Sequence, residues 1–318
     1  MELNQKKDIT AIFREALETF VEKIQMDDQV IAAILIGSLS YDQVWEKSDI
    51  DLRLIVHDQK LNRGYACFVE NDIPINASIQ TRNDFKRSVE GSVQSSISHS
   101  MLVRSTLLFT KDVTISEYLE QIRHVGERDR QLQLIELGSY ALSLQAKAEK
   151  WLYVKDDPIY SAVWVIKMID VLAQIEVVLH GDIPMREVVQ QAIRYNSDVF
   201  QVIYTDFVSE AINRHKVEEM LTLIHQYLIE RAESLFRPII QYLKDEGDMR
   251  TLNELVQKFN LLIQVNSATM TTVCDWLAER GLIAKLEADT KVTPKSRVML
   301  FEPAYVYEDE ISGMWGKA

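Results

Sequence analysis

Residues 30–56 read VIAAILIGSLSYDQVWEKSDIDLRLIV, and this stretch carries most of the information about how the N-terminal part of the chain folds. Its first seven residues are an apolar run that ends at Gly37 and Ser38, which is typical of a short strand followed by a turn. The last seven residues place Asp51 and Arg53 between apolar side chains, so we expect a second strand beside the first. The stretch therefore predicts two neighbouring strands, one ending in glycine and serine and the other beginning with two aspartates.

These four polar positions suit the binding of a phosphate and a metal ion. Glycine lets the backbone approach a phosphate closely, so Gly37 and the hydroxyl of Ser38 are candidates for holding phosphate oxygens. Asp49 and Asp51 are two residues apart on a strand and therefore point to the same face, while the apolar residue after each of them points into the core. Two carboxylates on one face suit Mg²⁺, which binds triphosphates and stabilises the displacement of pyrophosphate at the α-phosphorus.

The order LIGS at residues 35–38, followed by SDIDL at residues 48–52, resembles the motif of the DNA polymerase β-type nucleotidyltransferase superfamily. Within it, the chain is most similar to the bacterial antibiotic nucleotidyltransferases and their relatives. The resemblance covers about residues 10–120, including LFTKD at residues 108–112. It implies that Gly37 and Ser38 hold the nucleotide phosphates and that Asp49 and Asp51 bind Mg²⁺.

The chain departs from this family at the position of a third carboxylate, which the superfamily usually carries on a later strand. Here that strand reads INASI at residues 75–79, and it offers Asn76 and Ser78 on the face opposite its apolar residues. Asn76 can offer a carbonyl oxygen to a metal, but it has no negative charge and cannot accept a proton. The expected metal ligands are therefore Asp49, Asp51 and Asn76, with one ion held less well.

Three acidic residues near this strand are candidates to replace the missing carboxylate, although charged residues of this kind more often lie on the solvated surface. They are Glu70, Asp72 and Asp84. Two other interpretations of the motif stay open. An Asp-x-Asp pair also occurs in glycosyltransferases, which do not require a strand ending in Gly-Ser, and each half of the motif is common on protein surfaces.

The rest of residues 1–125 is typical of a mixed α/β domain. Apolar residues at steps of three and four predict a helix over residues 8–24, with Asp8 as its N-cap. We expect strands at residues 65–70 and 75–80 across a turn, a helix at 84–98 and a strand at 107–110.

Residues 126–245 carry the periodicity of helices and predict an all-α domain, similar in kind to the substrate-binding domains of the family. We expect helices at residues 129–154, at 158–179 with Pro158 in the first turn, and at 215–243 with a kink at Pro238. Four aromatic residues are candidates for lining an acceptor pocket, although this spacing is more often that of a core. They are Trp151, Tyr153, Tyr160 and Trp164.

Residues 246–318 predict two helices, at 248–259 and 268–280, and a hairpin formed by residues 282–286 and 298–301, which looks like a winged helix-turn-helix. A helical cap of the same shape is the alternative. Residues 246–301 contain seven basic and seven acidic residues, and this zero balance supports DNA binding only weakly.

Composition excludes several classes of protein. Gly and Pro number 10 and 6 in 318 residues, too few for an all-β sandwich, and 47% hydrophobic residues supply a sizeable core.

The net charge of −13 repels polyanions over long range. Cys67 and Cys274 allow at most one disulfide, and we expect both to be reduced, buried thiols. No apolar run suits a membrane span or a signal peptide, so we expect a cytoplasmic protein.

The sequence therefore predicts an α+β protein with a nucleotidyltransferase-like mixed sheet at residues 1–125, an all-α domain at 126–245 and a small winged-helix-like domain at 246–318. The predicted function is Mg²⁺-dependent transfer of a nucleoside monophosphate, with ATP the first candidate among NTPs, to an unknown hydroxyl-bearing acceptor, small or macromolecular. The alternative is a catalytically degenerate nucleotide-binding or regulatory protein that acts through its C-terminal domain. The amide at position 76 leaves open whether the chain is an enzyme.

Overall fold

The structure is a computed structural model that describes residues 2–42, 44–92, 101–122, 126–263 and 265–308. Contacts within the chain divide it into two compact units, residues 1–125 and residues 126–318. Each unit has its own hydrophobic core or cores, so each is described by itself.

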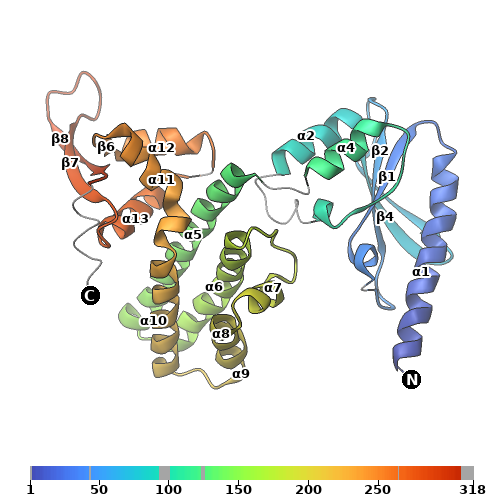
Figure 1. Ribbon diagram of the computed structural model, residues 1–318, viewed down its shortest axis with the longest axis horizontal. Helices are drawn as coiled ribbons and strands as arrows, with labels where there is room; N and C mark the ends of the chain where they lie inside the picture. The colour runs from blue at the N-terminus through green and yellow to red at the C-terminus, as the bar shows by residue number, and fades with distance from the viewer. Residues whose placement is uncertain (1, 43, 93–100, 123–125, 264, 309–318) are drawn as a thin grey trace. The chain divides into compact units, whose positions relative to one another are not determined.

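The first unit is built on a mixed five-stranded sheet (Figure 1). Its strands are β1 (Val30–Ile36), β2 (Ile50–Val56), β3 (Tyr65–Glu70), β4 (Ile73–Thr81) and β5 (Thr106–Thr110). The order across the sheet is β3-β4-β2-β1-β5, with β2 and β4 parallel and the other neighbours antiparallel. All the strands predicted from the sequence are confirmed, and β4 begins two residues earlier than expected. The parallel pair places the beginnings of β2 and β4 side by side, next to the end of β1.

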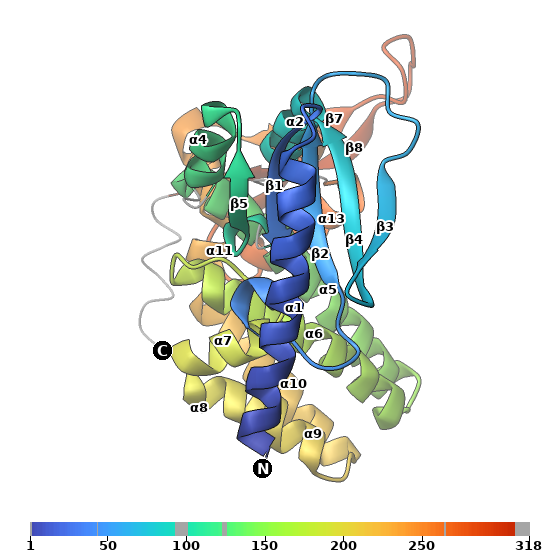
Figure 2. The same cartoon turned by 90° about the vertical axis from the view of Figure 1, so that its right-hand side faces the viewer.

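Helices cover both faces of this sheet, with α1 on one side and α2 and α4 on the other (Figure 1). They are α1 (Glu2–Gln25), the short 3₁₀ helix η1 (Ser38–Tyr41), α2 (Arg82–Ser92) and α4 (Val113–Gln121). Figure 2 looks onto the side that α1 occupies. Residues Phe13, Leu17 and Phe20 of α1 pack against Leu52 and Ile75 of the sheet, because the apolar positions of both elements repeat on one face.

Two expectations for these helices are wrong in detail. The helix α1 begins at Glu2, so Asp8 lies inside it and is not its N-cap. Ile12 is one of the apolar residues whose spacing of three and four predicts a buried face of this helix, but it is 51% exposed. The sequence analysis did not anticipate α4, and α2 begins two residues before the predicted start, while residues 93–98 of the predicted helix lie outside the described residues.

The second unit is mainly helical. Its helical elements before residue 247 are α5 (Glu127–Glu149), the π-helical turn η2 (Lys150–Val154), α6 (Pro158–Leu179), α7 (Val188–Tyr195), α8 (Ser197–Phe200), the π-helical turn η3 (Gln201–Asp206), α9 (Phe207–Ser209), α10 (Arg214–Glu230) and α11 (Ala232–Glu246). The predicted start of α6 is confirmed, because Asp157 caps it by accepting a hydrogen bond from the backbone N–H of Tyr160 at 2.9 Å, and Pro158 occupies the first turn.

The single long helix expected over residues 215–243 is wrong. The chain forms two helices, α10 and α11, with a break at Arg231, whose φ and ψ are −108° and 3°. A further non-helical residue, Phe236, lies two residues before Pro238 in α11. At this break, the Arg231 guanidinium lies 3.3 Å from the buried carboxylate of Glu176.

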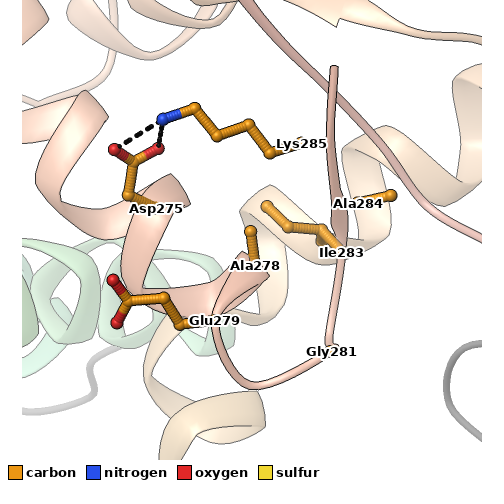
Figure 3. Close-up of a pocket in the computed structure, with 7 residues that line it drawn as sticks. All are labelled: Asp275, Ala278, Glu279, Gly281, Ile283, Ala284 and Lys285. Atoms are coloured by element: carbon orange, nitrogen blue, oxygen red, sulfur yellow. Dashed lines mark hydrogen bonds and ion pairs between the residues drawn. The ribbon is translucent and has the colours of Figure 1, made fainter.

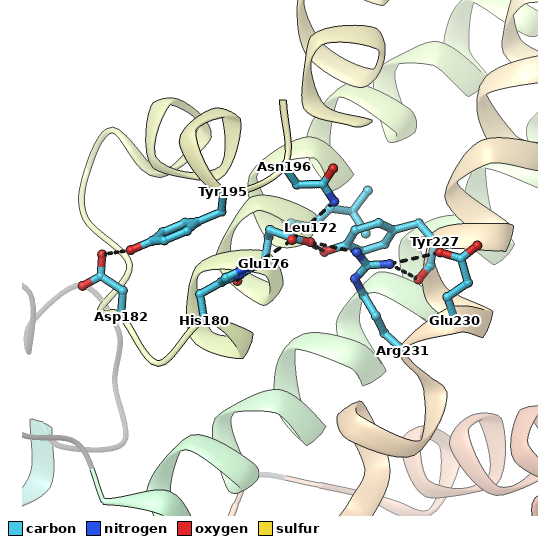
Figure 4. A network of polar contacts seen from close by, with 9 residues as sticks. All are labelled: Leu172, Glu176, His180, Asp182, Tyr195, Asn196, Tyr227, Glu230 and Arg231. Atoms are coloured by element: carbon cyan, nitrogen blue, oxygen red, sulfur yellow. Dashed lines mark hydrogen bonds and ion pairs between the residues drawn. The ribbon is translucent and has the colours of Figure 1, made fainter. Parts of the chain in front are cut away.

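Glu176 is the centre of a polar network inside the helical core (Figure 4). Its side chain is only 3% exposed, and it accepts hydrogen bonds from the Tyr227 hydroxyl at 2.7 Å and from the amide of Asn196 at 3.3 Å. The Arg231 guanidinium also stacks over the Tyr227 ring, 3.8 Å from its centroid. A buried carboxylate with these partners links α6, α10 and α11 in one arrangement.

The C-terminal part of the second unit contains a three-stranded sheet and two helices. The elements are β6 (Arg250–Thr251), α12 (Leu252–Asn260), α13 (Ser267–Ala278), β7 (Ala284–Thr290) and β8 (Leu300–Val306), and the sheet order is β6-β8-β7. The two predicted helices and the hairpin are present. Val273 and Leu277 of α13 belong to the same hydrophobic core as Leu142 of α5, so residues 126–245 and the C-terminal part share one core. None of the helices in the described part of the chain is long and apolar enough to cross a membrane.

Candidate active site

The turn after β1 depends on the backbone of Gly37. Its φ is 76° and its ψ is −162°, a conformation that residues with a Cβ rarely adopt. A Cβ at this position would also lie 2.6 Å from Oδ2 of Asp51. Glycine is therefore needed at position 37 for two reasons. Its backbone adopts a positive φ, and a Cβ would overlap the Asp51 carboxylate. Ser38 follows as the first residue of η1 and is partly exposed.

The β-sheet register brings the predicted site residues together. Asp51 lies opposite Ile36, the residue before Gly37, in the antiparallel pair of β1 and β2. It also lies opposite Asn76 in the parallel pair of β2 and β4. The Asn76 amide donates a hydrogen bond from Nδ2 to Oδ2 of Asp49 at 2.5 Å. Both aspartates and the asparagine therefore lie near the starts of the central strands β2 and β4, beside the glycine turn that follows β1.

This donor set fits one Mg²⁺ that is shared with a nucleotide. Mg²⁺ in nucleotide sites is usually held by one or two carboxylates together with phosphate oxygens and water, and Asp49 and Asp51 supply two. Within the described residues, no group of three or more His, Cys, Asp or Glu side chains is arranged to hold a metal. The Asn76 side chain carries no charge, and the amide atom that contacts Asp49 is its nitrogen, which cannot bind a metal ion.

None of the three neighbouring acids takes the third position. Glu70 faces the α1 side of the sheet, where its carboxylate lies 2.6 Å from Nζ of Lys23. Asp72 is in the exposed turn between β3 and β4, with a φ of 62°. Asp84 lies in the first turn of α2, where hydrogen bonds from Thr81 and then from Arg87 lower the pKa of its carboxyl. The proposed substitution of Asn76 by one of these acids is therefore not supported by their positions.

Sequence reasoning missed the side chains that extend this face of the sheet. Arg53 is two residues after Asp51 on β2 and lies on the same face, and burial lowers the pKa of its guanidinium. On β3, Tyr65 and Val69 are 79% and 67% exposed. Cys67 between them is also exposed, so the expectation that both thiols are buried is wrong for this one and confirmed for Cys274. The alternation that identified Asp49 and Asp51 was sufficient to identify Arg53.

The aromatic residues predicted to line an acceptor pocket lie in the second unit. The rings of Trp151 and Tyr160 are 4.2 Å apart and those of Tyr160 and Trp164 are 6.4 Å apart, whereas Tyr153 is exposed. Trp164 has the ammonium group of Lys147 at 4.8 Å and that of Lys167 at 4.4 Å from its ring centroid. These residues form an aromatic cluster around the start of α6, next to η2.

The second unit also contains two hollows that involve α13. One, of about 420 Å³, lies between α13 and β7 (Figure 3). Asp275 on its wall lies 2.8 Å from the ammonium group of Lys285 and accepts a hydrogen bond from the Tyr305 hydroxyl at 2.7 Å. The other, of about 310 Å³, is lined by residues of α5, α10 and α13, including His225. Because Asp275 is already paired within the unit, these hollows are weaker candidates for catalysis than the glycine turn and the two aspartates.

Comparison with known proteins agrees with this geometry. Residues 18–114 match the family model described as Polymerase beta, Nucleotidyltransferase. The crystal structure of a nucleotidyltransferase-like protein from Exiguobacterium sibiricum 255-15 matches with a TM-score of 0.63 and 15% identity, and covers 92% of this chain and 98% of that chain. No curated protein matches the chain.

Residues 18–114 of the first unit therefore match the nucleotidyltransferase family model, and the chain has an α+β fold similar to that of a nucleotidyltransferase-like protein. The predicted resemblance and the predicted fold class are confirmed. The similarity to the solved structure extends over most of the second unit as a likeness of fold.

Proposed function

We propose that the protein is a Mg²⁺-dependent nucleotidyltransferase that moves a nucleoside monophosphate from an NTP, with ATP the first candidate, to a hydroxyl-bearing acceptor. The observation that carries this proposal is the close approach of the Gly37 turn to the Asp51 carboxylate of β2, with Asp49 directly before the first residue of that strand. A backbone turn that can approach a phosphate closely therefore lies beside the carboxylate of Asp51, and the carboxylate of Asp49 is held nearby by the Asn76 amide. The match of residues 18–114 to a nucleotidyltransferase model supports the same reaction.

Each residue has a defined role in this proposal. The backbone at Gly37 and the Ser38 hydroxyl hold the triphosphate, and the Asp49 and Asp51 carboxylates hold Mg²⁺, which neutralises charge that develops on the phosphates. The acceptor oxygen forms a bond to the α-phosphorus while the bond from that phosphorus to the bridging oxygen breaks, and pyrophosphate leaves with the electron pair. Asn76 cannot take the hydroxyl proton, so the proton passes to solvent.

Thermal melting of the full chain tests the nucleotide site directly. We expect one NTP, together with Mg²⁺, to raise the melting temperature by about 5–10 °C at 100 times its Kd, because a ligand that binds the native state stabilises it. The double variant Asp49→Asn with Asp51→Asn should lose this shift. The matched control is Asp72→Asn, which removes one carboxylate at a turn position whose positive φ asparagine tolerates.

Two results would contradict the proposal. One is a nucleotide shift of equal size in the double variant and in the wild-type protein. The other is the absence of a shift with ATP, GTP, CTP and UTP in the presence of Mg²⁺. A positive result leads to a search for the acceptor by pyrophosphate release.

A second candidate is a regulatory protein that binds a nucleotide without transferring it and acts through a winged-helix-like C-terminal part. The hydrogen bond from Asn76 to Asp49 favours it, because an amide there replaces a charge that a second metal would need. The order β6, α12, α13, β7 and β8 supports the winged-helix interpretation. This candidate predicts nucleotide binding without pyrophosphate release, and its DNA-binding form requires binding that weakens as salt increases.

A further inference from the structure

Arg53 is a partly buried cation with no carboxylate partner among the described residues, and its electrostatic neighbour is the phenol of Tyr65. It lies in the middle of β2 and is neither fully buried nor exposed. Among the described residues, none forms a hydrogen bond or a salt bridge with its guanidinium. Arg82, Arg231 and Arg250, which are also partly buried, each lie within 4 Å of a carboxylate.

An unpartnered guanidinium at this depth is costly for the folded state. Arginine stays charged at all pH values of interest, and its five N–H groups lose water when they are partly buried. A chain that folds with this charge in place gains stability when a ligand supplies the missing negative charge. The expected ligand group is an oxyanion, since phosphate and carboxylate oxygens match the geometry of the guanidinium.

The position of Arg53 on the sheet indicates which substrate carries that oxyanion. Asp51 lies opposite Ile36 of β1, the residue directly before Gly37, whereas Arg53 lies opposite Ile34. Arg53 is therefore two residues further along the sheet from Gly37 than Asp51 is. If the triphosphate is held at Gly37, the pyrophosphate leaves on that side of the aspartates. The attacking hydroxyl must then come from the opposite side, because attacking and leaving oxygens are roughly in line. With that axis running along β2, Arg53 lies on the side of the incoming acceptor.

The neighbouring strands place small and exposed residues beside Arg53. The register places Ser78 of β4 beside Arg53, and Tyr65 of β3 beside Ser78, so the three residues form a row across one face of the sheet. Ser78 has a short side chain, and Tyr65 at the edge is 79% exposed. This row is adjacent to the row of Asp51, Asn76 and Cys67.

We propose that Arg53 binds a phosphate or carboxylate group of the acceptor, and that the acceptor is therefore an anionic hydroxyl compound. This inference rests on the proposed function, since it uses the placement of the triphosphate at Gly37. A cationic acceptor is disfavoured, because Arg53 would repel it. The nucleotide's own triphosphate is the other source of an oxyanion, and the test must separate the two sources.

The test measures the melting temperature of the full chain as inorganic phosphate is added, with sodium chloride at matched ionic strength as the blank. The variants are Arg53→Met, which keeps the length of the side chain without its charge, and Arg53→Lys, which keeps the charge. The matched control is Arg63→Met, an exposed arginine in the same unit. Each titration is repeated with Mg²⁺ and a saturating, non-hydrolysable ATP analogue.

We expect phosphate to stabilise the wild-type protein by a few degrees, with and without the analogue. The Arg53→Met variant should lose the phosphate shift, Arg53→Lys should keep part of it, and Arg63→Met should keep all of it. In the absence of phosphate, Arg53→Met should melt at the same temperature as the wild type or higher. A purely structural role for Arg53 predicts a lower melting temperature instead.

Three outcomes would overturn the inference. The first is an equal phosphate shift in Arg53→Met and wild type, and the second is a lower melting temperature of Arg53→Met without phosphate. The third is loss of the phosphate shift once the analogue is bound, which would assign the oxyanion to the nucleotide. Failure of the proposed function has a different signature, because the analogue itself would then leave the melting temperature unchanged while the phosphate shift still depended on Arg53.

Discussion

The Asn76 amide donates a hydrogen bond to the Asp49 carboxylate over 2.5 Å, at the position where the resemblance to the superfamily predicts a third acid. The contact satisfies Asp49 without a metal ion. An acid at the same position would bring two like charges together, and only a cation would make that arrangement favourable. If the site binds Mg²⁺ as proposed, the residue at position 76 sets how much the bound metal changes the stability of the first unit.

Asn76→Asp should make the stability of the first unit depend on Mg²⁺. We expect a lower melting temperature than wild type in EDTA, because one carboxylate must take up a proton or move away. Added Mg²⁺ should reverse the loss and shift the variant more than the wild type. Asn71→Asp, in the turn between β3 and β4, is the control. Equal responses of the Asn76 variant and the wild type to Mg²⁺ would count against this view of the site.

Gly37→Ala should destabilise the first unit by at least about 1–2 kcal/mol, the usual cost of a positive φ for a residue with a Cβ. The contact of that Cβ with Asp51 adds to the loss. Urea unfolding followed by circular dichroism measures the change. The control is Gly64→Ala, where the nearest atom to a new Cβ is 4.0 Å away. Similar midpoints for the two variants would contradict the requirement for glycine at the turn.

Removing the cation from the buried network should be more damaging than removing a hydroxyl. Arg231→Met leaves Glu176 without its ion-pair partner, and we expect a loss of about 3–5 kcal/mol in the free energy of unfolding. Tyr227→Phe removes one hydrogen bond and should cost about 1–3 kcal/mol.

A double-mutant cycle separates the pair from its surroundings. The variant Glu176→Gln with Arg231→Met should be less damaged than the sum of its single variants, because it leaves no uncompensated charge. Arg87→Met breaks an exposed ion pair with Asp84 and serves as the control, with a change of no more than about 1 kcal/mol. Additive losses in the cycle would show that the pair does not act as a unit.

His225 should make the second unit less stable at acidic pH. Burial, followed by the charge of Arg280, lowers the pKa of this histidine in the folded state. The unfolded chain therefore binds a proton first as the pH falls below about 6.5, and the folded state loses stability from there downward. His225→Gln should flatten the pH dependence of the melting temperature between pH 7 and 5. His215, which is exposed, provides the control variant His215→Gln, and an equal flattening there would contradict the assignment.

The two thiols should react differently with a thiol reagent at neutral pH. Cys67 is exposed on the edge strand β3, whereas Cys274 is buried in α13, and burial raises the pKa of its thiol. We therefore expect one fast-reacting thiol per native chain and two after denaturation. Cys67→Ser should remove the fast reaction, and Cys274→Ala should not. Two fast thiols in the native wild type would contradict the burial of Cys274.

The strands β1 and β2 beside the site could be predicted from the sequence, because each depends on a short local pattern. The apolar run that ends at Gly37 and the alternation around Asp51 are local features that depend on one strand each. The hydrogen bond from Asn76 to Asp49 is different, because it depends on the parallel register of β2 and β4. The sequence indicates both strands but contains no local signal for which residues face each other across the pair.

The break between α10 and α11 also depends on distant residues. The residues around Arg231 have ordinary helix propensity, and the only visible breaker, Pro238, lies seven positions later. The break occurs where the Arg231 side chain reaches Glu176, a residue more than 50 positions earlier. Local propensity does not predict a break at this point, and the periodicity of the sequence gives no sign of the distant residue that Arg231 contacts there.

The position of β1 inside the sheet has a consequence for the order of events during synthesis. Ala33 pairs with Phe109, so β1 acquires its second neighbour only after a long stretch of chain has been made. Closing such a loop is entropically unfavourable, and sheets with distant partners fold slowly. A nascent chain that ends before Thr106 therefore contains Gly37, Asp49, Asp51 and Asn76 but exposes one edge of β1. The sheet is complete only after β5 has been synthesised. Until then, the unpaired edge of β1 can pair wrongly with strands of other chains.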